Sequence, residues 1–457
     1  MSVISRKGES LRRLVSTSKM GKYVVLESPP VPDDAFVDGL GGGTRPNDAV
    51  DNALLFAVAR NAVELLVTGD GGILKKAMRA GLAERVYSPD QLYALLRLLE
   101  AEPPKRHGPV TRLPVHDLDL DDPFFDSIRE DYPGFDGWLQ RVGRGGRNCY
   151  ALREGGNLEA LMIYKEVEAA SDYAGVPPNS FKISTLKVSS TAEGKKLGEL
   201  FLKIAVWAAF QQRRAGVFVT VFPRHEGLVH ILGEFGFGHV SQTELGEDVY
   251  LKRFYGQHVG LGPETLDDRG LGFTRRFYPS FRDGADVAKF VVPIQPSYHA
   301  RLFPEGMGEQ STLRTFTSEV AIEGNTIRKA YLSNAKIKEL GPGSVLLFYR
   351  SHDRRAVESI GVVEGSYRPA TADEAAALAG KRTVYSFREI SVLSEKPLLL
   401  VLFWHVAELP NGVTFETMKR HGVVTGPIQT IARLPEPRYR RFKEVAHLDE
   451  RLAISQT

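Results

Sequence analysis

Residues 181 to 237 constrain the fold of this chain more than any other segment of its sequence. An apolar-rich run with Ile183, Leu186 and Val188 predicts a strand, and a small polar loop follows it as far as Gly198. Apolar residues then recur at helical spacing, which predicts an amphipathic helix with one apolar face: Leu200, Phe201, Ile204, Ala205 and Ala208. A β-branched run over 217–221 predicts a second strand, and a second short helix is expected before Gly236.

The loop before the first helix suits a phosphate group. A helix N-terminus presents unpaired backbone N–H groups and the positive end of the helix dipole, which together attract anions such as pyrophosphate. On these residues, the segment resembles the cofactor-binding half of a GNAT-type acetyltransferase. The resemblance implies that the backbone of the first strand pairs with the pantetheine arm of acetyl-CoA and that the loop holds its pyrophosphate. The cofactor-binding residues it implies are Leu186, Val188, Gly194, Lys195, Lys196, Leu197, Gly198 and Glu199.

The segment departs from the family pattern at several positions. The family loop reads Gln/Arg-x-x-Gly-x-Gly/Ala, and here Glu193 and Lys196 replace the first residue and the first glycine. The family's general-acid tyrosine corresponds to Leu232, and an asparagine near the start of the last helix corresponds to His225. An ordinary βαβ unit and a GNAT fold that has lost catalysis are the alternatives.

A β-hairpin is predicted upstream, over 149–164, with a Glu-Gly-Gly-Asn turn between its strands. Glu166 and Glu168 follow it and are candidates for a general base, the alternative being a solvated strand end. His225 and His230 are further candidates for proton transfer, or simply exposed helix residues.

Residues 22–100 predict a different α/β unit, with a helix starting at Asp51, a strand over 64–68 and a helix over 72–80. This pattern resembles the C-terminal half of a PIN domain, a nuclease fold that clusters carboxylates around Mg²⁺ or Mn²⁺. The resemblance implies Asp51 and Asp70 as metal ligands, with Asp48 nearby. The opening strand and its first aspartate are missing, so we expect a degenerate domain or a start codon placed too late. Helix capping is the alternative role of both aspartates.

The C-terminal third is rich in predicted strands. Residues 324–350 are expected to form a short helix, a Gly-Pro-Gly turn and a buried strand, followed by strands over 356–364 and 398–407. This pattern resembles a PUA-superfamily β-barrel of the ASCH or EVE kind, which implies a pocket for RNA or modified bases. The residues expected at that pocket are Arg328, Lys329, Tyr331, Tyr349, Arg350 and Trp404, with core packing as the alternative for the aromatic residues.

Composition fits a soluble protein of two to four domains. The chain has 59 basic and 56 acidic residues, so its net charge of +3 does not demand a nucleic-acid partner. Its single cysteine, Cys149, excludes an internal disulfide framework, and a reducing cytoplasm is expected. Since no apolar run approaches membrane-spanning length, no membrane partner is expected.

Together these patterns predict a multidomain protein of α/β and α+β classes. We expect an incomplete PIN-like domain over 1–105, a GNAT-like domain with a mixed sheet over 106–258, and a linker with a PUA-like barrel over 259–457. The predicted activity is acetyl transfer from acetyl-CoA to an amine, on RNA or an RNA-associated protein. The alternatives are a non-catalytic nucleic-acid-binding regulator of a toxin–antitoxin type and a metal-dependent ribonuclease. The sequence makes no prediction of oligomeric state.

Overall fold

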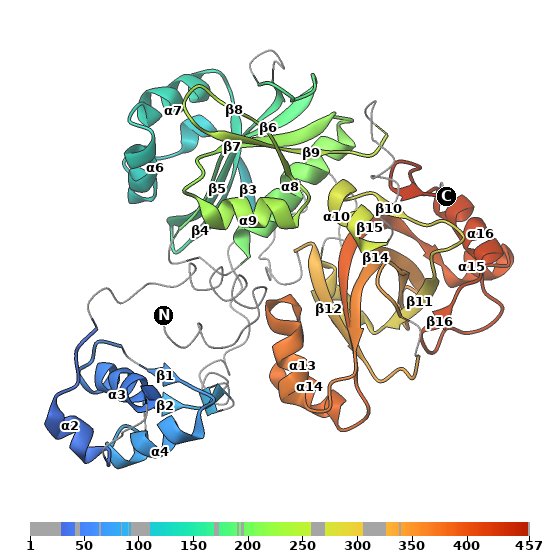
Figure 1. The fold of residues 1–457 in the computed structure, drawn as a ribbon. Helices are drawn as coiled ribbons and strands as arrows, with labels where there is room; N and C mark the ends of the chain where they lie inside the picture. Colours follow the sequence, from blue (N-terminus) through green and yellow to red (C-terminus); the bar gives the residue numbers. More distant parts are fainter. Residues whose placement is uncertain are drawn as a thin grey trace. The chain divides into compact units, whose positions relative to one another are not determined.

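The structure is a computed structural model that describes most of the chain. The described residues are 29–41, 46–63, 65–83, 85–89, 91–92, 110–168, 173–189, 192, 196–256, 270–304, 326–337 and 340–455. They belong to two compact units, Met1–Pro103 and Pro104–Thr457, each of which is described by itself (Figure 1). Within these ranges, no helix is long and apolar enough to cross a membrane.

The first unit is small and helical, with a two-stranded parallel sheet. Its elements are α2 (Asp34–Gly39), α3 (Pro46–Ala59), β1 (Leu66–Val67), α4 (Gly71–Arg79) and β2 (Val86–Tyr87). The predicted strand and second helix are confirmed as β1 and α4. The first helix starts at Pro46 rather than at Asp51. Proline fits the first turn, because the N–H groups there have no acceptor within the helix and the missing N–H of proline costs no hydrogen bond.

The second unit begins with a seven-stranded mixed sheet in the order β3-β4-β5-β6-β7-β9-β8. Its elements are β3 (Val110–Pro114), η2 (Val115–Asp117), η3 (Pro123–Phe125), α6 (Asp126–Asp131), α7 (Phe135–Arg144), β4 (Asn148–Glu154), β5 (Asn157–Glu168), β6 (Ser180–Val188), α8 (Leu197–Gln211), β7 (Gly216–Val221), α9 (Glu226–Glu234), β8 (Gly238–Gln242) and β9 (Asp248–Arg253). The predicted hairpin is confirmed as β4 and β5, which pair from Cys149↔Ile163 to Glu154↔Asn157. The predicted strands and helices of segment 181–237 are confirmed as β6, α8, β7 and α9.

The second unit continues with a six-stranded mixed sheet in the order β12-β15-β14-β13-β11-β16. β10 and β17 form a separate two-stranded parallel sheet. This part of the unit comprises α10 (Leu271–Phe277), β10 (Phe281–Arg282), β11 (Lys289–Ile294), α11 (Pro296–Leu302), β12 (Arg328–Ser333), β13 (Val345–Arg350), β14 (Ala356–Tyr367), α13 (Ala372–Ala379), η8 (Gly380–Arg382), α14 (Phe387–Ser394), β15 (Leu399–Thr414), α15 (Phe415–Arg420), β16 (Ala432–Arg433), α16 (Glu436–Ala446) and β17 (Ala453–Ile454). We refer to residues 270–455 as the C-terminal domain.

Two expectations for the C-terminal domain differ from the structure. The helix expected after Gly324 is instead strand β12, which pairs antiparallel with β15 from Arg328↔Trp404 to Ser333↔Leu399. Pairing with a buried neighbour overrides the helical pattern there, as tertiary contacts often do for short segments. Among the described strands, the large sheet is open rather than a closed barrel, with β12 and β16 at its ends. The strands expected around 345–350, 356–364 and 398–407 are confirmed as β13, β14 and β15.

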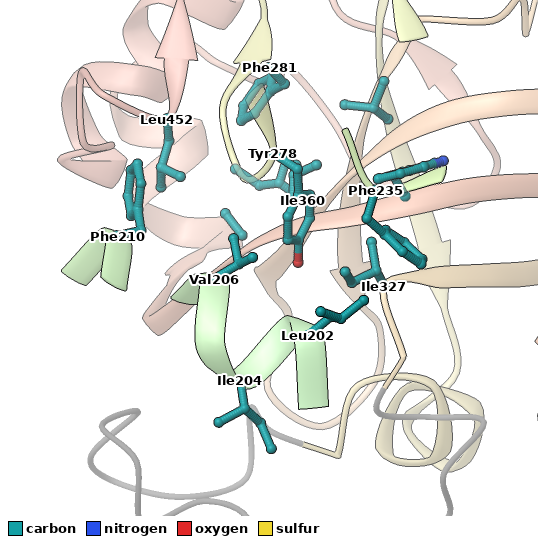
Figure 2. Close-up of a cluster of buried hydrophobic side chains, with 14 of the residues drawn as sticks. Leu202, Ile204, Val206, Phe210, Phe235, Tyr278, Phe281, Ile327, Ile360 and Leu452 are labelled. Atoms are coloured by element: carbon teal, nitrogen blue, oxygen red, sulfur yellow. The ribbon is translucent and has the colours of Figure 1, made fainter. Parts of the chain in front are cut away.

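Helix α8 is buried on more than the one face that its sequence predicted. It contacts β5, β6 and β7 of the first sheet. Three side chains outside the predicted apolar face, Leu202, Val206 and Phe210, are also buried, at 4% exposure or less. Figure 2 shows Leu202 and Val206 directed towards Ile327 and Ile360, and Phe210 beside Leu452. An apolar surface all round a helix is expected when the helix lies between two layers, and here the C-terminal domain supplies the second layer.

Buried polar contacts also join the two parts of this unit. The Lys252 ammonium of β9 donates to the carbonyl oxygens of Phe235 at 2.7 Å and of Arg275 and Arg276 at 3.1 Å each. Burial lowers the pKa of Lys252 to about 7. Three carbonyl acceptors nevertheless match the three protons of the charged ammonium, so these bonds oppose the loss of a proton.

Gly236 provides a test of this packing. Its φ is +77°, and a Cβ there would lie 2.3 Å from the Arg275 carbonyl oxygen. Gly236→Ala should therefore lower the free energy of unfolding by about 2 kcal/mol or more, from backbone strain and overlap together. Gly233→Ala is the matched control, since a Cβ at Gly233 meets nothing within 4 Å. Denaturant unfolding of both variants measures the difference, and equal stabilities would contradict this packing.

Candidate functional site

The candidate site lies where strands β6 and β7 separate. The two strands are parallel but pair only over three registers, from Phe181↔Val217 to Ile183↔Val219. β6 continues to Val188 and β7 to Val221 without further pairing to each other. On its other edge, β6 skips Ser184 in its register with β5, which is a β-bulge. The bulge coincides with the separation, so the backbone of β6 beyond Ser184 has no β7 partner, and Leu186 and Val188 lie on this stretch.

Helix α8 begins shortly after the separated end of β6. Its N-cap residue, Lys196, has φ +58° and makes no side-chain capping hydrogen bond. Leu197 and Gly198 form the start of the helix, and a Cβ on Gly198 would meet only Ile231 Cδ1, at 3.6 Å. The predicted loop residues Gly194 and Lys195 lie outside the described residues. The first backbone N–H groups of an α-helix have no partner within the helix, so a helix start such as that of α8 attracts anions.

Glu199 is one of the predicted cofactor-binding residues, but its side chain faces the C-terminal domain. The carboxylate is 1% exposed and accepts a hydrogen bond from the backbone N–H of Arg328 at 2.8 Å. Any contact of Glu199 with a cofactor would therefore involve its backbone.

A polar group lies at the strand separation, on the side of α6 and α7. Arg147 donates to the Ser184 hydroxyl at 3.4 Å. The buried carboxylate of Glu247 accepts from the hydroxyls of Tyr132 at 2.6 Å and Thr220 at 3.3 Å. Burial, and then the hydrogen bond to Glu247, raises the pKa of Tyr132, so this hydroxyl stays protonated. The sequence analysis did not identify Tyr132 or Glu247, because each becomes a neighbour of β7 only through the tertiary fold.

His225, a predicted catalytic residue, lies at the N-cap of α9 beside this group. Its Nε2 is 2.8 Å from a carboxylate oxygen of Asp131, and Arg224 contacts the other oxygen at 2.6 Å. The imidazole is about two-fifths exposed, so it is accessible to a solute. A histidine held by a carboxylate is a common arrangement for a general base, because the carboxylate fixes the ring and stabilises its charged form. His230, by contrast, is exposed and lies 3.7 Å from Glu234 on the same helix.

Glu166 and Glu168, the other predicted bases, lie at the opposite end of β6 from its separated stretch. Glu168 is register partner to Ser180 and is held by Lys165 at 2.5 Å and Lys182 at 4.0 Å. Glu166 is 3.8 Å from Arg112 and is more exposed. Both contacts tie Glu168 to lysines of β5 and β6, away from the separated stretch of β6.

The C-terminal domain contains a cavity of about 780 Å³ at the ends of β11, β12 and β13. Of the residues predicted for an RNA pocket, Tyr331 and Tyr349 line it, together with Tyr298, Tyr385, His352 and Arg355. The other predicted pocket residues have different surroundings. Trp404 is 1% exposed and donates to Glu364 at 3.2 Å, and Lys329 is buried with its ammonium donating to the Leu302 carbonyl. Arg328 pairs with Glu199 and Glu234, and Arg350 with Asp353 and Glu358.

The C-terminal domain also contains two buried histidines, His299 on α11 and His405 on β15. Burial, followed by the charge of Arg350, lowers the pKa of His299 to about 3, and burial likewise lowers that of His405 well below its usual value. Both rings are therefore neutral at physiological pH. His299 lies 3.6 Å from Glu358, whose own pKa is raised by burial.

The predicted metal ligands do not form a metal site in the described part of the first unit. Asp70 caps α4 by accepting from the Gly72 N–H at 2.7 Å, and Asp51 lies 3.1 Å from the Lys76 ammonium. Lys76 also contacts Asp48 at 2.9 Å, so a lysine supplies the positive charge between these carboxylates. No group of three or more His, Cys, Asp or Glu suitable for a metal ion occurs among the residues described. The donor set does not fit Mg²⁺ or Mn²⁺.

Comparisons with known proteins find matches only among solved structures, at low identity and over part of the chain. No protein-family model and no curated protein matches the chain. Solved structures that match part of this chain include ASCH from Zymomonas mobilis, at 9% identity over 34% of this chain and 94% of that one, with a TM-score of 0.26. They also include a GNAT-family acetyltransferase from Staphylococcus aureus Mu50, at 11% identity over 32% of this chain and 98% of that one, with a TM-score of 0.25. A third is the PaiA N-acetyltransferase from Thermoplasma acidophilum in complex with coenzyme A, at 14% identity over 30% of this chain and 82% of that one, with a TM-score of 0.23.

Proposed function

We propose that this protein transfers an acetyl group from acetyl-CoA to an amine acceptor. The observation that carries the proposal is the separation of β6 from β7 at the Ser184 bulge, on the strand that precedes α8 in sequence. An unpaired strand backbone suits the two amides of a pantetheine arm, which can pair with it as an added strand. The N-terminus of α8 suits the pyrophosphate that follows that arm.

The residues at the separation have distinct roles in this proposal. The backbone of Leu186 and Val188 orients the donor, and the first turn of α8 from Leu197 to Glu199 holds the phosphates. Arg147, Glu247 and Tyr132 are the polar groups on the acceptor side. GNAT acetyltransferases use a tyrosine as general acid, and Leu232 stands at the corresponding position of this chain. Because Leu232 is fully buried and has no proton to donate, other groups carry out proton transfer in this proposal. His225, oriented by Asp131, is the base in this proposal, and positioning supplies much of the remaining rate enhancement.

Gly198 tests the donor site. Gly198→Glu puts a carboxylate in the first turn of α8, where it repels pyrophosphate while favouring the helix itself. Isothermal titration with acetyl-CoA should show wild-type binding in the micromolar range, about 8 kcal/mol, and loss of binding in this variant. Gly198→Ala is the matched control and should bind within about threefold of wild type, because its Cβ makes only an ordinary contact.

Absence of acetyl-CoA binding by the wild type would reject the acetyl-transfer proposal. A second candidate, binding of a single-stranded RNA base in the cavity lined by Tyr331 and Tyr349, would then lead. Arg355 is exposed at the rim of that cavity, and Arg355→Glu should weaken binding of an oligouridine probe if this candidate is correct.

His225 tests the proposed base. His225→Gln should lower kcat by about 100-fold or more, since it removes a positioned proton acceptor but leaves the donor site intact. The measurement is CoA thiol release with a panel of primary amines as acceptors. His230→Gln is the matched control on the same helix and should keep wild-type kcat. Full activity in His225→Gln would assign the base role elsewhere.

A further inference from the structure

The first turn of α8 carries a buried negative charge that the C-terminal domain neutralises. Glu199 accepts from the Arg328 backbone N–H, and its carboxylate lies 3.6 Å from the Arg328 guanidinium. The same guanidinium lies 3.3 Å from Glu234 of α9 and stacks over the Phe235 ring at 5.0 Å. Arg328 is the first residue of β12 and is 129 positions away from Glu199 in sequence. Although burial works against its charge, Glu199 and Glu234 raise the pKa of Arg328, so the group is ionised.

This pairing matters because Glu199 occupies the anion-binding end of the helix. A carboxylate in the first turn interacts favourably with the positive end of the helix dipole, and it repels a second anion there. Lys196, 3.9 Å from Glu199, compensates part of this charge. Arg328 compensates it at 3.6 Å from a buried position, where screening by solvent and salt is weak.

A second arginine of the C-terminal domain contacts the other end of α8. Arg451 donates to the Phe210 carbonyl at 2.9 Å and lies over the Phe210 ring at 4.5 Å. It contributes to the same interface as Arg328, but it is a whole helix length away from Leu197. It is therefore a natural control that separates loss of the interface from loss of charge at the first turn.

We propose that Arg328 is a positioning residue of the donor site, through which the C-terminal domain neutralises Glu199 and makes the N-terminus of α8 competent for the pyrophosphate of acetyl-CoA. This inference rests on the proposed function. It implies that the first sheet and α8 do not form a complete donor site by themselves. It also gives Glu199 a structural role through its side chain rather than a direct contact with the cofactor.

The test is titration of full-length variants with acetyl-CoA. Arg328→Met keeps the backbone hydrogen bond and the apolar stem but removes the charge, and Kd should rise about tenfold or more. Arg451→Met should stay within about twofold of wild type. The double variant Glu199→Gln/Arg328→Met removes both charges and should recover to within about threefold of wild type, which a purely structural role of Arg328 would not produce. Wild-type affinity in Arg328→Met, or no recovery in the double variant, would overturn the inference.

Hydrogen exchange separates failure of this inference from failure of the proposed function. Amides 200–204 of α8 should exchange faster in Arg328→Met than in Arg451→Met, without any ligand present, because an uncompensated buried charge destabilises the first turns. If the wild type does not bind acetyl-CoA, the proposed function fails. Equal exchange of these amides in the two variants would then overturn the positioning role as well.

Discussion

The structure of the larger unit depends on burial of α8 between two sheets. One side of the helix packs on β5, β6 and β7, and other side chains along its length pack on the C-terminal domain. Burial of a leucine, valine or phenylalanine side chain contributes roughly 1.5–3 kcal/mol, so Leu202, Val206 and Phe210 together provide a substantial share of a domain's net stability. Without the C-terminal layer, these three side chains would form an exposed apolar stripe along the helix.

The same burial fixes the candidate site. α8 starts nine positions after the last residue of β6 and packs on β6, so a helix held from both sides keeps its first turn at a constant place relative to the unpaired strand backbone. The first turn of the helix is held by a polar contact from the C-terminal domain, between Arg328 and Glu199. A site that relies on backbone N–H groups rather than on mobile side chains gains from such rigid support.

Local patterns predicted the elements well, and distant contacts account for the errors. The hairpin of β4 and β5 was predictable because its turn and alternation lie within 16 residues of sequence, and α9 was predictable from its glycine terminus. Strand β12 was expected to be a helix because only its pairing with β15, about 70 residues later, makes it a strand. The second buried face of α8 has a signal in its nearly continuous apolar run from Leu200 to Phe210, which one amphipathic face does not require.

For the candidate site, the sequence predicted the place of backbone elements but not the contacts of side chains. Leu186, Val188 and Gly198 lie at the strand separation and the helix start, as the sequence pattern predicted. The roles of Asp131, Tyr132 and Glu247 follow from side-chain contacts between segments far apart in sequence, which no local pattern encodes. Trp404 and Lys329 resemble pocket residues by type, but their neighbours in the fold bury them.

Native-state hydrogen exchange along the whole chain tests the central claim most directly. If α8 joins both sheets into one cooperative unit, the slowest amides of β6, β7, β13, β14 and β15 should exchange with the same free energy and the same denaturant dependence. A set of β6 and β7 amides that opens at distinctly lower free energy, while β13 to β15 stay protected, would contradict the account.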